Sequence, residues 1–597
     1  MSLRRGVILV LTLIGLTVLL AVASLLVLYM AAARGPSIPD GAVLVLRPGG
    51  GLPDVRPDDL VGQVLGREQT TLRGLVESLR KAARDPRIEA VILRPSSFDA
   101  PFWGKLQELR GAIADFRRSG KPVIAHLEYG GDREYYLASA ADRVFLLPTS
   151  AIDLTGIASY EVFLRGTLDK LGAYPDFLQI GPYKTAANQL TQRGFTEAHR
   201  EMSEALNRDL YEQLVLGIAE GRRKTPGEVR TLLDDGPFVS EAAARTGLVD
   251  GLAYFDQLDD LVADLAAGPG ALPLVEGADY ERVSARSAGL RPQSRIAVLH
   301  ASGVITSGGS TYDAVNGPTV GSDTFVEQVR RLRDDESIEA IVLRVDSPGG
   351  SSIASDVIWR ELTITRDGNP SRPLVASMAD VAASGGYYIA MPAHVIVAEP
   401  GTLTGSIGIY GGKVAIGGAM EKIGVTTETI ASGRNAAIGS PFEPFSPEQR
   451  ERLMVYMTSF YDSFVEKAAQ SRRTTAERID AVAQGRVWTG RQAQQRGLVD
   501  VLGGLDAAVA IAKERAGIPA DEDVELVMYP PRRSLYEAIA AAVGGASWGP
   551  GAAVDLAGTA SALPLTADDL RRVTGALAPV RLFRRGEPLA LMPGWVR

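Results

Sequence analysis

The chain contains one long segment twice, and this internal repeat restricts its fold more than any other feature. Residues 75–94 read LVESLRKAARDPRIEAVILR, and residues 325–344 read FVEQVRRLRDDESIEAIVLR, an offset of 250 residues. The motif Gly-Leu-Val-Asp at 247–250 recurs at 497–500 with the same offset. Solenoid repeats have periods of about 20 to 50 residues, so this period is far too long for one. The sequence therefore predicts two related domains, over residues 40–290 and 295–540.

Each copy alternates amphipathic helical segments with short apolar runs. In the first copy, the spacing of apolar residues predicts a helix over 75–84 and a buried strand at 90–93. A second helix over 106–116 and a second strand at 122–125 follow. Helix and strand in repeated alternation are typical of βαβ units around a parallel sheet. We therefore expect an α/β fold with two largely parallel sheets.

The N-terminus carries an apolar run long enough to cross a membrane. No charged residue interrupts residues 6–33, and about 20 residues suffice to span the hydrocarbon core. Arg4 and Arg5 precede the run, so the positive-inside rule places residues 1–5 in the cytoplasm and the bulk on the other side. A cleaved signal peptide is the alternative, but its apolar region is normally only about 7–15 residues long. We favour one uncleaved transmembrane helix.

Residues 541–597 follow the second copy. Residues 544–559 are rich in Gly and Ala with little charge, which is typical of a linker. Residues 567–576 are a candidate for a polar helix, and Leu589 to Met592 form an apolar end. The sequence assigns this segment no role.

Composition excludes several classes of chemistry. The chain has no cysteine, which excludes thiol catalysis, disulfides and Cys-type metal sites. It has four histidines, and none lies three or four residues from another, so an HExxH metal site is excluded. We find no P-loop motif and expect no metal and no cofactor. The net charge of −8 and the lack of a basic stripe argue against nucleic acid as a partner.

The two copies differ at three places where chemistry could occur. The second copy runs from an apolar strand into the paired glycines Gly349 and Gly350, whereas the first has Leu-Arg-Pro-Ser-Ser at 93–97. Adjacent glycines can present backbone N–H groups to an oxyanion. Taken alone, a tight turn explains them as well.

The second difference is Ser384, in AASGGYYIA at 382–390, where the first copy has GDREYY at 131–136. A serine between a strand and a helix can expose its hydroxyl as a nucleophile, or it can simply cap the helix. The third difference is Ser406, in LTGSIG at 403–408. It could hydrogen-bond a catalytic group or a loop amide.

An activated serine needs a base, and no histidine here lies in a triad-like motif. A lysine can serve where burial lowers its pKa. Lys184 lies in GPYKTA at 181–186 of the first copy, and our alignment places Ala436 opposite it in the second. A solvated surface lysine is the ordinary interpretation. The asymmetry favours a functional one, because one copy carries the lysine and the other the serine.

These motifs together resemble the signal peptide peptidase A family in its long, duplicated form. The resemblance rests on GPYKTA at 181–186, DSPGG at 346–350, ASGGYY at 383–388 and LTGSIG at 403–408. It implies two tandem ClpP/crotonase-like repeats and a serine protease with a Ser–Lys dyad. It also implies a homotetramer, tethered to the bacterial inner membrane with its bulk in the periplasm, that degrades cleaved signal peptides.

By position, the resemblance makes Ser384 the nucleophile, Lys184 the general base and Ser406 the support of the lysine. Gly385 with Gly349 or Gly350 would form the oxyanion hole. Two other functions stay open at this point. One is a crotonase-like acyl-CoA hydratase or hydrolase, and the other is a catalytically silent membrane scaffold.

Overall fold

The computed structural model describes residues 36–54, 70–99, 102–258, 261–263, 273–313, 317–531 and 589–591, with the isolated positions 16, 17, 20 and 24. Apart from those four positions, the predicted anchor at 6–33 lies outside the described residues. The predicted linker and polar helix also lie outside them. No helix in the described part of the chain combines the length and apolarity that a membrane crossing requires.

The first repeat is built around a six-stranded sheet in which all neighbouring strands are parallel. Its central strands are apolar runs buried on both faces, as expected where helices cover a parallel sheet. The predicted strands and helices of this repeat are confirmed to within a few residues. In sheet order the strands are β10 (Leu274–Glu276), β1 (Ala42–Leu46), β2 (Ile88–Leu93), β3 (Val123–Leu127), β5 (Arg143–Leu146) and β9 (Gly251–Leu252), and the predicted helices are α3 (Leu72–Arg84) and α4 (Gly104–Arg117).

The second repeat has the same strand order, which confirms the duplication in three dimensions. Tyr135 donates its hydroxyl hydrogen bond to the Leu248 carbonyl at 2.6 Å, and Tyr387 donates to that of Leu498 at 3.0 Å. This sheet adds β19 (Leu403–Gly405) and the antiparallel β21 (Val487–Thr489) at the end of β17. The equivalent strands, in order, are β23 (Val524–Tyr529), β11 (Ser294–Ser302), β15 (Ala340–Ser347), β17 (Leu374–Ala383), β18 (Val395–Ala398) and β22 (Val501–Leu502).

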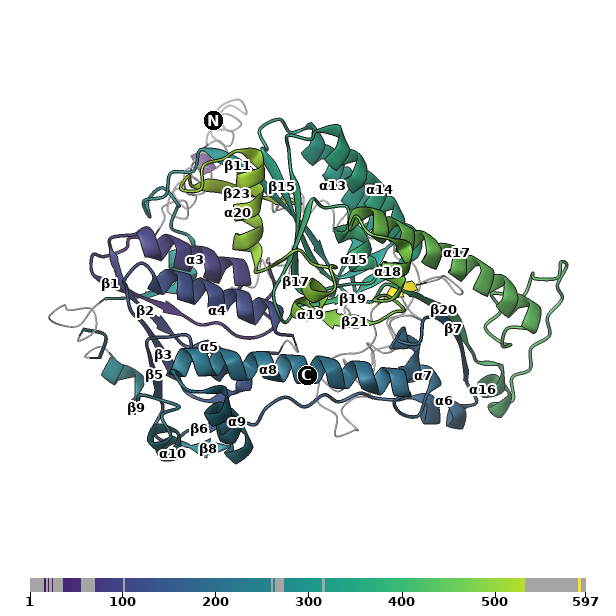
Figure 1. Ribbon diagram of the computed structural model, residues 1–597, viewed down its shortest axis with the longest axis horizontal. Helices are drawn as coiled ribbons and strands as arrows, with labels where there is room; N and C mark the ends of the chain where they lie inside the picture. Colours follow the sequence, from purple (N-terminus) through teal and green to yellow (C-terminus); the bar gives the residue numbers. More distant parts are fainter. Residues whose placement is uncertain are drawn as a thin grey trace, which may run out of the picture.

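The two repeats are joined by shared structure (Figure 1). Strand β7 (Tyr174–Ile180) of the first repeat pairs along its whole length with β20 (Ile409–Ala415) of the second, antiparallel. The long helix α8 (Glu197–Arg222) starts beside β7 and runs back to the first sheet. On the way it passes the second repeat, where Asp209 pairs with Arg491 at 2.8 Å. Strand β7 and helix α8 of the first repeat therefore pack against the second repeat.

The remaining elements complete the layers. A seven-stranded sheet has the order β13-β14-β12-β16-β24-β20-β7, and a three-stranded sheet has the order β4-β6-β8. The strands of these two sheets not yet given are β4 (Gly130–Gly131), β6 (Ala151–Asp153), β8 (Phe238–Val239), β12 (Val304–Thr306), β13 (Tyr312–Asp313), β14 (Gly317–Gly321), β16 (Gly349–Ser351) and β24 (Leu589–Leu591).

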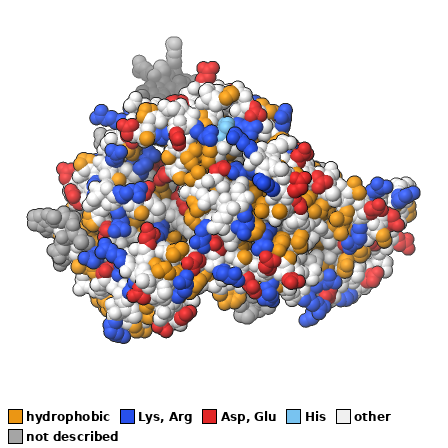
Figure 2. All heavy atoms as spheres, in the orientation of Figure 1, with side chains coloured by type: hydrophobic (Ala, Val, Ile, Leu, Met, Phe, Trp, Pro, Cys, Tyr) orange, Lys and Arg blue, Asp and Glu red, His pale blue; other side chains and the backbone are white. Residues whose placement is uncertain are grey.

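On the face drawn in Figure 2, Lys and Arg side chains are interspersed with Asp and Glu.

The other helices surround these sheets. In the first repeat they are α5 (Asp132–Ala138), α6 (Arg165–Leu171), η1 (Thr185–Ala187), α7 (Asn188–Thr191), α9 (Pro226–Asp235), α10 (Ser240–Arg245), η2 (Phe255–Gln257) and α12 (Gly277–Glu281). In the second repeat they are α13 (Ser322–Asp334), α14 (Ser352–Gly368), α15 (Gly385–Ala390), α16 (Gly417–Lys422), α17 (Pro447–Ser471), α18 (Ala476–Asp480), α19 (Gly490–Gln495) and α20 (Leu505–Ala516).

Candidate active site

Ser384 occupies a strained turn between β17 and the short helix α15. Its backbone has φ +57° and ψ −114°, a conformation that costs a non-glycine residue about 1–3 kcal/mol. Its N–H donates to the Gly405 carbonyl at 2.8 Å, which fixes the turn to β19. The Ser384 side chain makes no capping hydrogen bond to α15. The alternative interpretation of this serine as a helix cap is therefore wrong.

Lys184 reaches the same place from the other repeat. It follows β7, which is held against β20 by a register that pairs Ile180 with Ile409. The turn after β7 packs on the second repeat, because the Tyr183 N–H donates to the Gln484 carbonyl at 3.1 Å. The pairing of β7 with β20 thus places Lys184 against the second repeat, although it belongs to the first.

The lysine and the serine meet in a fully buried contact. Lys184 Nζ lies 2.7 Å from Ser384 Oγ, 2.9 Å from the Ser406 carbonyl oxygen and 3.0 Å from Ser406 Oγ. All three residues are 0% exposed. The structure therefore brings together the three polar side chains that the sequence analysis selected.

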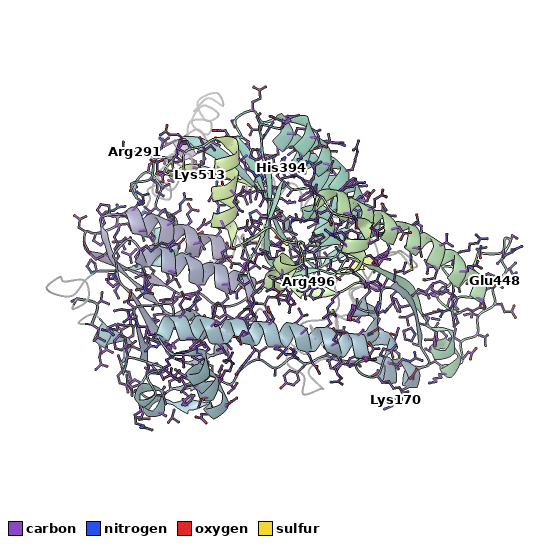
Figure 3. The ribbon with its side chains drawn as sticks, in the orientation of Figure 1. Lys170, Arg291, His394, Glu448, Arg496 and Lys513 are labelled. Carbon is purple, nitrogen blue, oxygen red and sulfur yellow. The ribbon has the colours of Figure 1, made fainter. Side chains whose placement is uncertain are left out.

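Ser406 is held in place by Arg486, the residue that precedes β21. Its N–H donates to the Arg486 carbonyl at 2.7 Å, and its own φ is +50°. Trp488 pairs with Thr404 across β19 and β21. The guanidinium of Arg496, labelled in Figure 3, lies 3.8 Å from the centre of the Trp488 ring. The Arg496–Trp488 stack and the pairing of Trp488 with Thr404 thus position the loop in which Ser406 contacts Lys184.

The three candidate oxyanion-hole glycines lie together beside the serine. A Cβ at Gly385 would lie 3.1 Å from both the Gly349 Cα and the Gly350 nitrogen. Gly349 and Gly350 have φ of +101° and +157°, and a Cβ at Gly350 would lie 2.0 Å from the Ile305 carbonyl oxygen. Only glycine fits that position, because φ is positive and the neighbouring atom is backbone.

Two buried lysines near the site have pKa values shifted in opposite directions. Burial lowers the pKa of Lys184 well below its ordinary value of 10.5, and the hydrogen-bond partners of its Nζ are uncharged serine oxygens. Burial also acts on Lys105, but the attraction of Asp346 and Asp380 outweighs it and raises the pKa of Lys105. Burial therefore favours the neutral form of the Lys184 amine, whereas the two carboxylates favour the cationic form of Lys105.

The first repeat has a carboxylate where the second has its serine. Aligning Tyr135 with Tyr387 places Asp132 opposite Ser384. The Asp132 carboxylate accepts from the N–H groups of Thr155 and Gly156 at 3.2 and 3.0 Å, and burial raises its pKa to about 6. In the first repeat this turn is therefore used to fix a loop.

Two supports of the site were missed by the sequence analysis. Gly485, with φ +78°, packs so closely on Lys184 that a Cβ there would lie 2.4 Å from the Lys184 nitrogen. Lys105 Nζ lies 2.6 Å from an Asp346 oxygen and 3.4 Å from an Asp380 oxygen, which ties α4 to the ends of β15 and β17. Asp346 lies in the DSPGG motif, but its partner is more than two hundred residues away in the sequence.

The chain matches one family model and several known proteins. The family model for peptidase family S49 matches residues 115–267 and 367–519, one stretch in each repeat. The chloroplastic serine protease SPPA of Arabidopsis thaliana is 36% identical over 467 residues, 76% of this chain and 67% of that protein. Protease 4 of Salmonella typhi is 34% identical over 462 residues, 75% of this chain and 72% of its own. A solved mutant of the 1510-N membrane-bound stomatin-specific protease aligns over 40% of this chain and 100% of its own, at 19% identity and a TM-score of 0.25.

Proposed function

The chain belongs to peptidase family S49 and is a serine protease, and on that premise we propose that Ser384 is its nucleophile and Lys184 its general base. The observation that carries the proposal is the buried contact of 2.7 Å between Lys184 Nζ and Ser384 Oγ. We propose repeats at 40–290 and 295–540 with the ClpP/crotonase-like fold. One repeat supplies the base and the other supplies the nucleophile.

The surroundings of the Lys184 amine suit a base. A neutral amine has two N–H groups and one lone pair. The Ser406 carbonyl and hydroxyl oxygens, at 2.9 and 3.0 Å, can accept the two N–H groups. The lone pair then faces the Ser384 hydroxyl, which donates its proton to Nζ. Ser406 therefore orients the lysine.

The reaction follows from these positions. Lys184 takes the Ser384 proton as Oγ bonds to the peptide carbonyl carbon, and the oxyanion accepts from the N–H groups of Gly385 and of Gly349 or Gly350. The C–N bond then breaks, and Lys184 gives its proton to the leaving amine. Water hydrolyses the acyl-enzyme in a second cycle through the same base.

We propose cleaved signal peptides and similar apolar, extended peptides as substrates. The motifs that resemble signal peptide peptidase A support this choice. The apolar run at 6–33 supports an anchor in the bacterial inner membrane, with residues 1–5 in the cytoplasm and the bulk in the periplasm. We propose a homotetramer on the same resemblance.

An acyl-CoA hydratase or hydrolase would need no acyl-enzyme at Ser384, and a silent scaffold would need no base. A fluorophosphonate probe distinguishes these functions from a protease. We expect it to add its mass to Ser384 in the wild type and to leave Lys184→Ala nearly unlabelled. An unlabelled Ser384 in folded wild-type protein would contradict the proposed mechanism.

The activity should rise with pH. Burial lowers the pKa of Lys184, so below that pKa the amine is protonated and cannot accept the Ser384 proton. We expect kcat/KM for a peptide to increase with pH through an acidic limb that lies below pH 10.5, the ordinary value for lysine. Lys184→Arg should be inactive throughout, because a guanidinium stays charged.

Chelators and thiol reagents should leave this profile unchanged. Inhibition by a chelator that added zinc reverses would contradict the lysine mechanism. An activity that falls steadily as pH rises from 6 to 9 would do the same.

Each chain should carry a complete dyad. Lys184 and Ser384 meet within one chain through the β7–β20 pairing, so two chains that each lack one member cannot complement each other. We expect co-expressed Lys184→Ala and Ser384→Ala chains to show no peptide cleavage above either variant alone. Recovery of a substantial fraction of wild-type activity would show instead that the dyad forms between subunits.

A further inference from the structure

The strand that leads to Ser384 contains a bulge. Met378 of β17 pairs with Val345 of β15, in register with the pairs before it. The next pair joins Ala382 to Ser347, so β17 holds two more residues than β15 between the two pairs. Before this bulge β17 pairs with β18, and from the last bulged residue onward it pairs with β19. Bulges redirect the side chains around them and are frequent beside active sites, so this one helps to set the position of Ser384.

The bulged residues, Ala379 to Val381, bond to groups outside the regular strand pairing. The Thr402 hydroxyl donates to the Ala379 carbonyl at 2.6 Å. The Val381 N–H donates to the Asp346 carboxylate at 3.2 Å. Buried backbone groups need such partners, so the shape of the bulge depends on where the Asp346 carboxylate lies.

The N-terminus of α4, from the first repeat, packs on this bulge, and one end of α4 lies beside β17 in Figure 1. A Cβ at Gly104 would lie 2.6 Å from the Ala379 carbonyl oxygen, so the approach is as close as glycine allows. The Lys105 N–H donates to the Asp380 carboxylate at 2.9 Å, and Trp103, the N-cap residue of α4, makes no side-chain capping bond. The dipole of α4 also favours a carboxylate there. Asp380 of the second repeat thus caps a helix of the first.

The side chain of Lys105 joins two carboxylates that precede the proposed catalytic groups. Its Nζ lies 2.6 Å from an Asp346 oxygen and 3.4 Å from an Asp380 oxygen. Lys105 is 8% exposed, and charges sheltered from water attract each other more strongly than a surface pair does. Asp346 comes three residues before Gly349, and Asp380 comes four residues before Ser384. One cation therefore holds the start of the candidate oxyanion-hole segment against the start of the nucleophile turn.

Lys105 is present in only one copy of the duplication. The strands before and after α4 align with the second copy at offsets of 250 and 251, which place Ser355 and Asp356 opposite Lys105. Ser355 donates instead to the Ser351 carbonyl at 2.8 Å, within its own repeat. The shared fold therefore does not need a lysine here, as it does not need the lysine or the serine of the proposed dyad.

We infer that Lys105 is a positioning residue of the protease, which reaches from the first repeat to hold the bulge of β17 and thereby orients Ser384 toward the candidate oxyanion-hole glycines. The inference rests on the function proposed above and gives the first repeat a second role besides supplying the base. Lys105 acts through Asp346 and Asp380 rather than on the reacting atoms. Its loss should therefore slow the chemical step and leave peptide binding almost unchanged.

Two variants remove the contact of the Lys105 side chain with the carboxylates. Lys105→Met leaves both carboxylates without their cation. The double variant Lys105→Met, Asp346→Asn avoids most of this imbalance, because an amide oxygen can still accept from the Val381 N–H. Burial raises the pKa of Asp380, which favours the neutral form of the carboxyl group that remains. We therefore expect the double variant to fold.

Lys81→Met is the matched control. Lys81 is 1% exposed, and its ammonium donates to three carbonyls of its own repeat, those of Tyr280, Glu281 and Val283. The measurement is the labelling of Ser384 by a fluorophosphonate, followed over time and to completion. The final extent counts the molecules with a working serine, whereas the rate constant reports how well the serine and the oxyanion hole are placed.

We expect both Lys105 variants to label to full extent with a rate constant about 10²-fold below that of the wild type, since a displacement of about 1 Å at a catalytic group can cost this factor. For a peptide substrate, kcat should fall by a similar factor, and KM should stay within a few-fold of the wild type. Lys81→Met should keep the wild-type rate constant in the molecules that label.

A wild-type rate constant with a reduced final extent in the Lys105 variants would overturn the inference, since Lys105 would then only stabilise the fold. A raised KM with unchanged kcat, or loss of folding in both variants, would overturn it as well. An unlabelled Ser384 in the wild type would count against the proposed function. Normal labelling of the wild type and of both variants would count against the positioning role alone.

Discussion

Ser384→Ala and Lys184→Ala are each expected to lower kcat for a peptide substrate by about 10⁴-fold or more, with the double variant about as inactive as either single one. The physical reason is the contact of 2.7 Å between Nζ and Oγ, across which the proposed base would take the proton of the proposed nucleophile. A steady-state peptidase assay of the three variants against the wild type measures both the loss and its non-additivity. A Lys184→Ala enzyme with near wild-type turnover would show that another base serves Ser384.

Matched substitutions separate this loss from a folding defect. Ser240 is buried and donates to the Pro148 carbonyl at 2.6 Å, and Lys513, labelled in Figure 3, donates to the Ala520 and Glu522 carbonyls. Neither residue contacts the proposed dyad. We expect Ser240→Ala and Lys513→Ala to keep their activity to within a few-fold wherever the protein remains folded.

The stability of a lysine variant gives an independent check. Burial lowers the pKa of Lys184, so between that pKa and 10.5 the unfolded chain binds the proton that the folded protein has released. The lysine therefore lowers the free energy of unfolding as pH falls below 10.5. Lys184→Met should be more stable than the wild type at neutral pH, with a gain that shrinks toward pH 10.5. An inactive but more stable enzyme excludes unfolding as the cause.

The second large effect is expected at the junction of the repeats, where Arg344→Met should lower the free energy of unfolding by about 3–5 kcal/mol. Arg344 is 0% exposed, and its guanidinium bonds both carboxylate oxygens of Asp54 at 3.0 Å. It also lies 2.9 Å from a Glu108 oxygen, and burial raises the pKa of Glu108 to about 7. Methionine would leave both carboxyl groups buried without the guanidinium that pairs with them, and only the charge of Lys105 would still attract Asp54.

Urea unfolding measures this loss, and Arg330→Met is its control. Arg330 pairs with Glu361 at 2.9 Å but is 59% exposed, so its loss should cost at most about 1 kcal/mol. The difference in free energy of unfolding between Arg344→Met and the wild type should become smaller at low pH, because protonation removes the charge on Asp54. The double variant Arg344→Met, Asp54→Leu should recover most of the stability, since an apolar replacement of a buried pair is often neutral. An Arg344→Met deficit no larger than that of Arg330→Met would contradict the assignment.

The sequence was sufficient to predict the repeats and to select three polar side chains that the structure brings into contact. The apolar runs of the buried strands and the period of the helices are local patterns, so they predicted α3, α4, β2 and β3 to within a few residues. The comparison of the two copies isolated Lys184, Ser384 and Ser406, because a residue present in only one copy is not needed by the shared fold. The peptidase resemblance is confirmed by the match of both repeats to family S49.

Contacts between distant segments were decided by the tertiary structure. The sequence alone left open whether Ser384 caps a helix, and its backbone conformation and lack of a capping bond answer that question. The pairing of β7 with β20 determines that Lys184 contacts Ser384. Lys105 pairs with Asp346 and Arg344 pairs with Asp54, and both ion pairs join the two repeats. The position of residues 589–591 between β16 and β20 is another contact between segments far apart in the sequence. Periodicity records which side of a segment is buried, whereas the partner that buries it depends on strand register and on the docking of the two repeats, which no local pattern encodes.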